Sequence, residues 1–169
     1  AALGSLRKVP VAVWTAALGV FAALYLAFFS LQAGYLFGAF VKMIPDGYTI
    51  AEYARQGFFS LCRVMAVNFA LLWLVTRACV KPVRQEKTLL LLCAVLLCQS
   101  LVFAAIAASK LYLYISSYGF TPRRLQSAWL IAVLAAGTGC ALYSLVTGKK
   151  AVRYWMLFSA ATLMLLSLY

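Results

Sequence analysis

Residues Val9–Val41 read VPVAVWTAALGVFAALYLAFFSLQAGYLFGAFV and contain no charged side chain. A transmembrane helix needs about 20 apolar residues, at about 1.5 Å of rise each, to cross a hydrocarbon core near 30 Å thick. As one helix this run is roughly 50 Å long, too long for one upright span and too short for two. It predicts a single long helix over about 10–40, whose second half packs against protein or projects beyond the bilayer.

The rest of the chain has the same apolar character. Of its 169 residues, 66% are hydrophobic and 11% are charged, whereas a soluble domain is about 45–50% apolar and about 25% charged. So few polar side chains cannot cover a water-facing surface of this size. The composition therefore predicts an integral membrane protein.

Further runs with few charges predict four more helices. At the start of the predicted helix near residue 122, Thr121 suits the N-cap and Pro122 the first helical position. We expect one all-α transmembrane domain over 1–169, a bundle of about five helices with a polar loop or amphipathic segment at 43–56. The predicted spans are about 10–40, 56–76, 87–116, 123–146 and 151–169.

The net charge of +12 has a membrane explanation, because basic residues flank spans and meet anionic head groups. With no long basic face or RNA motif, we expect no nucleic-acid partner. Nine basic residues fall on one side of the predicted bundle, and the positive-inside rule puts that side, with the N-terminus, in the cytoplasm and the C-terminus outside. The nine are Arg7, Lys8, Arg77, Lys81, Arg84, Lys87, Lys149, Lys150 and Arg153.

Two polar segments interrupt the apolar runs, residues 44–59 and 109–124. Five spans would place both on the same side of the membrane, where they can form one site. That side carries six basic residues against Asp46 and Glu52, a local charge of +4. Such a site would prefer an anion, such as a lipid phosphate, a carboxylate or a polyanionic glycan.

From the first polar segment into the helix that follows it, the spacing of Glu52, Arg55, Phe59 and Arg63 places them on one face. Thr49 with Glu52 three residues later also forms a capping-box pattern, so a structural role for Glu52 competes evenly with a functional one.

Arg63 and Lys110 fall inside predicted spans, where a charge costs about 2.5–3.5 kcal/mol at the bilayer centre. Intramembrane charges are functional candidates by default. The competing interpretation is that both long side chains snorkel to the nearby interface.

Tyrosines and phenylalanines surround these charges, and they suit either an interfacial aromatic belt or an aromatic-lined basic pocket. The predicted ligand-binding residues are Glu52, Arg55, Arg63, Lys110, Tyr114, Tyr118, Arg123 and Arg124.

The sequence contains few residues suited to catalysis or metal binding. The chain has no histidine and no hydrolase or phosphate-loop motif, so Asp46 and Glu52 are the only weak candidates for an acid–base pair. Its five cysteines form no C-x-x-C pair. We expect no metal site and no cofactor.

The strings IPDGYT (44–49), AEYARQGFF (51–59), KLYLY (110–114) and YGFT (118–121), followed by Arg124, resemble the signature of a bacterial polytopic membrane family catalogued only as a domain of unknown function. The chain resembles its C-terminal half. The resemblance implies a bacterial cytoplasmic-membrane protein and carries no established activity. The residues that match motif positions are Glu52, Tyr53, Ala54, Arg55, Gly57, Phe58, Lys110, Tyr114, Tyr118, Gly119 and Arg124.

The leading functional hypothesis is a membrane protein that binds an anionic lipid or solute at a basic aromatic site on the non-cytoplasmic side. One alternative is a structural or signalling subunit with a protein partner in the membrane. Another is an enzyme using Asp46 and Glu52 on a lipid-linked substrate. A transporter would need a polar path through the bilayer, for which the far half offers only Thr76, Gln99, Ser100, Thr138 and Ser144.

Overall fold

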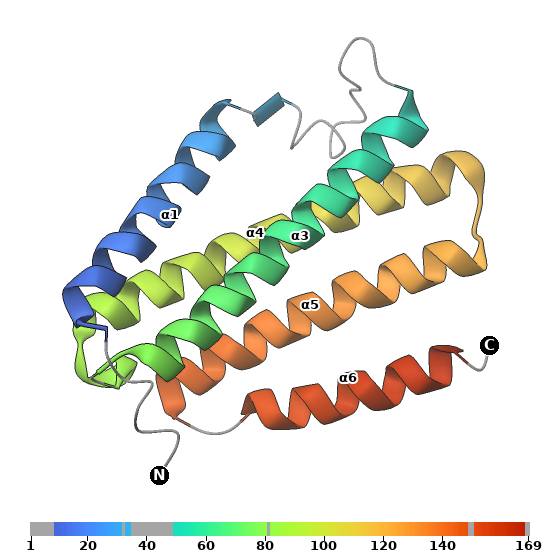
Figure 1. Cartoon of the computed structure of the whole chain (residues 1–169). Coiled ribbons are helices and arrows are strands. Elements are labelled where there is room, and N and C mark those ends of the chain that lie inside the picture. Colours follow the sequence, from blue (N-terminus) through green and yellow to red (C-terminus); the bar gives the residue numbers. More distant parts are fainter. Residues whose placement is uncertain (1–8, 32, 35–48, 81, 149–150, 168–169) are drawn as a thin grey trace.

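The computed structural model describes residues 9–31, 33–34, 49–80, 82–148 and 151–167. This part of the chain is helical throughout apart from short connections, and α3 to α6 run antiparallel in succession (Figure 1). The helices are α1 (Val11–Leu31), α3 (Ile50–Ala78), α4 (Lys87–Tyr118), α5 (Pro122–Thr147) and α6 (Ala151–Ser167), and a 3-10 turn, η2, covers Val83–Gln85.

Four of these helices are long and apolar enough to cross a membrane, namely α1, α3, α4 and α5. This confirms the predicted all-α membrane fold. The 17 described residues of α6 give a helix of about 26 Å, somewhat short of a hydrocarbon core near 30 Å. A fifth span at 151–169 therefore stays a prediction.

The helix bounds refine the predicted spans. Helix α1 lies within the range predicted at 10–40 and covers Val11–Leu31, while residues 35–48 lie outside the described part. The predicted span 56–76 lies inside α3, which starts earlier because Thr49 caps it seven residues before the predicted start, and which continues to Ala78. Both α4 and α5 agree closely with the predicted ranges.

Helix α4 lies at the centre of the bundle and packs against α1, α3 and α5, while α6 packs mainly on α5. At one end, called here the α3–α4 end, the backbone of Val9 bonds to that of Ala78 and Val80. At the same end, Arg84 donates to the carbonyl of Val146 at 3.0 Å. The start of α3 and the α4–α5 turn meet at the other end, called the α4–α5 end.

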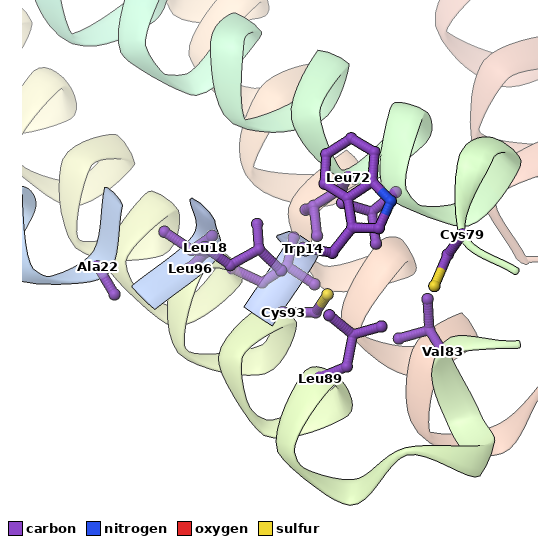
Figure 2. Packing of buried hydrophobic residues seen from close by; sticks show 11 residues of the cluster. Trp14, Leu18, Ala22, Leu72, Cys79, Val83, Leu89, Cys93 and Leu96 are labelled. Atoms are coloured by element: carbon purple, nitrogen blue, oxygen red, sulfur yellow. The ribbon is translucent and has the colours of Figure 1, made fainter. Parts of the chain in front are cut away.

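Two apolar clusters hold the bundle together. At the α3–α4 end, Trp14 and Leu18 of α1 point toward Leu72 of α3 and Leu96 of α4 (Figure 2). Toward the α4–α5 end, Phe103 of α4 is fully buried and stacks on Phe29 of α1, with ring centroids 4.7 Å apart. Each cluster joins at least three helices, so the bundle is held along its length.

A hydrogen-bonded chain of polar side chains crosses the apolar interior. Tyr25 of α1 donates to Asn68 of α3 at 2.7 Å, and the Asn68 amide donates to Ser100 of α4 at 2.7 Å. Asn68 and Ser100 are buried. Polar contacts of this kind contribute about 0.6–2 kcal/mol each between membrane helices. These hydrogen bonds therefore tie α1, α3 and α4 together and fix their register.

Helix α6 is anchored by its tryptophan. Trp155 donates from its indole nitrogen to the carbonyl of Val133 at 2.8 Å, and its ring lies against Gly137 of α5, where any Cβ would collide with it. A second tie joins Trp129 to Thr162 at 3.1 Å. Close approach at small residues is the usual way for membrane helices to gain packing energy.

We therefore predict that Gly137→Ala destabilises the protein by about 1–3 kcal/mol, because the new methyl group pushes the Trp155 ring off α5. Gly139→Ala is the matched control, since a Cβ there meets nothing within 4 Å. Alanine at position 139 should be neutral or stabilising, because glycine costs about 1 kcal/mol in a helix. Thermal unfolding of the detergent-solubilised chain measures both, and equal melting temperatures would contradict the anchoring role.

Candidate functional site

The two faces of α3 near its start have opposite characters. Glu52, Arg55, Phe59 and Arg63 are all exposed, and with Gln56 and Ser60 they line a groove of about 560 Å³. The opposite face is buried in the bundle and consists of Tyr53, Ala54, Gly57, Phe58 and Leu61. The four residues thus share one face of α3, as predicted, and this face points away from the other helices.

Lys110 lies on the buried side and is completely inaccessible to solvent. Its ammonium nitrogen is 3.5 Å from the centroid of the Tyr53 ring, a distance typical of a desolvated cation–π contact. Gly57 makes room for the stem, because a Cβ there would lie 2.6 Å from the Lys110 Cδ. Lys110 therefore points into the bundle rather than snorkelling, and it does not share the groove of Arg55 and Arg63.

Glu52 serves as the helix cap that the sequence pattern predicted. Its Oε2 accepts from the Thr49 hydroxyl at 2.7 Å and from the Thr49 backbone N–H at 3.2 Å. The Thr49 hydroxyl in turn accepts from the Glu52 N–H at 3.3 Å. This reciprocal pair satisfies backbone donors at the start of α3. Asp46, the other weak catalytic candidate, lies outside the described residues.

At the α4–α5 turn, Arg124 packs on tyrosines from the end of α4. Its guanidinium carbon lies 4.1 Å from the Tyr114 ring centroid and 5.8 Å from that of Tyr118, and it donates to the Gly119 carbonyl. Gly119 ends α4 with a φ of 77°, a conformation that favours glycine. Arg124 thus holds this turn together, while Arg123 is exposed beside it.

The eight predicted site residues therefore occupy three places: the outer groove of α3, the buried α3–α4 contact and the α4–α5 turn. Sequence reasoning did not select Tyr53 and Gly57 as site residues. The resemblance matched both to motif positions, and their contact with Lys110 gives the physical reason. Within the described residues, no three histidine, cysteine, aspartate or glutamate side chains gather where they could hold a metal ion.

We predict that Thr49→Ala destabilises the protein by about 1 kcal/mol, because the first turn of α3 loses its side-chain cap. Thr49→Ser keeps a hydroxyl at the same place and should retain most of the stability. Chemical unfolding in mixed micelles measures the difference, and equal midpoints for the two variants would show that the cap does not support α3.

We predict that Gly57→Ala is destabilising, because the added Cβ displaces the Lys110 stem from the Tyr53 ring. Gly19→Ala in α1 is the control, since a Cβ at Gly19 meets nothing within 4 Å. Both variants replace a helical glycine, so the sterically free one should melt at or above the wild-type temperature and Gly57→Ala below it. A Gly57→Ala protein as stable as Gly19→Ala would mean that Lys110 is not held there.

The comparisons with known proteins give one match. A family model described as a domain of unknown function, DUF4153, matches residues 3–169. No curated protein matches the chain, and no solved structure does. The matched range covers every described helix, and the helices are those of an integral membrane protein. The chain therefore belongs to the DUF4153 family of domains of unknown function.

Proposed function

We propose that the chain binds the phosphate of an anionic phospholipid in the outer groove of α3, through Arg55 and Arg63. The observation that carries the proposal is the groove itself, which presents two exposed arginines on the outer surface of a membrane-spanning helix. Glu52, the acid beside them, already has its Oε2 engaged by Thr49. The groove therefore offers an excess of positive charge to the surrounding lipid.

The position of Arg63 along α3 suits a lipid head group. Arg77, near the far end of α3, is 14 residues away, about 21 Å along the helix axis. If Arg77 marks one boundary of a hydrocarbon core near 30 Å thick, Arg63 lies about 9 Å inside the other boundary. The long arginine side chain extends toward that boundary by snorkelling. Arg55, eight residues earlier, lies about 12 Å further along the helix axis, just outside the boundary and at the level of the lipid head groups.

The groove also has the right chemistry between its two cations. A guanidinium can donate two parallel hydrogen bonds to a phosphate, which makes arginine well suited to this group. Gln56 and Ser60 line the groove between the arginines and add an amide and a hydroxyl donor. Phe59 supplies apolar surface for the glycerol and the start of an acyl chain.

The other hypotheses gain less support. A transporter needs a polar path, but the buried Asn68, Ser100 and Thr138 are engaged in hydrogen bonds within the bundle. An enzyme needs a free acid or base, and Glu52 is engaged as a cap. A lipid-binding site needs neither a path nor a free acid, so it agrees best with the described residues.

We predict that Arg63→Gln removes one tightly bound phosphatidylglycerol per chain. Arg123→Gln, which removes an exposed charge from the start of α5 at the same end of the bundle, should leave that lipid bound. Native mass spectrometry of chains released from bilayers of phosphatidylglycerol and phosphatidylcholine counts the bound lipids. Equal losses in the two variants would assign the effect to net charge, and unchanged binding in Arg63→Gln would overturn the proposal.

A further inference from the structure

A second groove, of about 780 Å³, lies between α3 and α6 over a floor made by α4 and α5. It falls within the range of about 300–1,000 Å³ that is typical of ligand pockets. Its lining is mostly apolar and aromatic, and includes Phe69, Trp73, Leu97, Ala141, Trp155 and Met156. None of these residues belongs to the outer groove of α3.

The way α6 is anchored keeps this groove open. Trp155 and Thr162 tie α6 to α5, so α6 does not pack closely along α3. The two helices meet where the ring of Phe69 stacks on that of Trp155, with centroids 5.7 Å apart and planes at 12°. Both rings of the stack belong to the lining of the groove.

The groove has the length of one lipid leaflet. Its lining on α3 extends from Ala66 to Thr76, ten residues or about 15 Å along the helix. That is half of a hydrocarbon core about 30 Å thick. The groove therefore runs from the α3–α4 end of the bundle to about the middle of the membrane, as an acyl chain does.

The open end of the groove is basic. Arg84 belongs to its lining and is held there by a hydrogen bond of 3.0 Å from Nη2 to the Val146 carbonyl. A guanidinium has five N–H donors, so others remain to bind an anion. Arg77, Lys87 and Arg153 are exposed at the same end. This charge complements a lipid phosphate.

Ser144 adds a polar group just inside that end. Its hydroxyl oxygen is buried and has no hydrogen-bond partner among the described residues, and the residue lines the groove. A buried hydroxyl left unsatisfied costs about 1–3 kcal/mol. One turn from the end of α5, it lies at the depth where a phospholipid carries its ester carbonyls, which are hydrogen-bond acceptors.

We infer that this groove holds one acyl chain of an anionic phospholipid from the leaflet at the α3–α4 end, with its phosphate at Arg84 and its ester region at Ser144. The cations at the open end favour this occupant over a transmembrane helix of another protein, because a lipid carries its phosphate at that depth. The inference does not rest on the outer groove of α3, which lies at the other end.

The test uses the whole chain in nanodiscs that contain phosphatidylglycerol with a photoreactive diazirine in one acyl chain. Crosslinks mapped by mass spectrometry should concentrate on the α3 and α6 segments that line the groove. Ala141→Phe fills the groove and should reduce these crosslinks several-fold. Ala132→Phe makes the same change at an exposed position of α5 and should leave them unchanged.

A second arm tests the head group. Unlabelled phosphatidylglycerol should compete for the groove several-fold better than phosphatidylcholine, and Arg84→Gln should abolish that preference while Arg63→Gln preserves it. Equal competition by both lipids in the wild-type chain would overturn the head-group assignment without any variant. Crosslinks spread evenly over the outer surfaces would show annular lipid only. Crosslinks to a second copy of the chain would show a protein occupant, and either result would overturn the inference.

Discussion

Inside a bilayer, every backbone N–H and C=O must find its partner within the protein, because hydrocarbon offers none. This constraint makes the chain helical, and it also decides what remains for side chains to do. Lipid is as apolar as leucine, so exposed residues such as Trp73 and Leu91 cost little. Helix association then depends on close fit and on polar contacts, which here are the Trp155–Gly137 contact and the hydrogen bonds through Asn68.

The elements that the sequence predicted well are those set by local rules. Uncharged runs located the helices. The capping-box pattern of Thr49 and Glu52 was recognised, but the predicted span began at residue 56, so the first turns of α3 were left outside it. What escaped prediction depends on partners far away in the chain. From the sequence, Lys110 suited both snorkelling and a functional intramembrane charge, and only its contacts with Gly57 and Tyr53 of another helix show that it is buried. The buried hydrogen bonds through Asn68 also escaped prediction. Asn68 is the only asparagine of the sequence and lies in an apolar run, and this was the signal that could have indicated them.

The three conspicuous cations of the polar segments show how little residue type alone determines. Arg63 faces outward along α3, Lys110 faces inward against Tyr53, and Arg124 packs on Tyr114 to hold a turn. The tyrosines are thus not only an interfacial belt, because at least two of them are partners of cations. A view based on composition merges these places into one site. The geometry separates an outward-facing groove from a buried contact and a turn support.

The burial of Lys110 has a consequence for how the chain enters the membrane. Insertion of α4 alone would bring a bare charge into hydrocarbon, at a cost of about 2.5–3.5 kcal/mol near the centre. The ring and the glycine that shelter this charge belong to α3, which is synthesised first. The cost of placing α4 in the bilayer is therefore lowest when α3 lies beside it. The contact that fills the interior thus also makes the two helices depend on each other in the membrane.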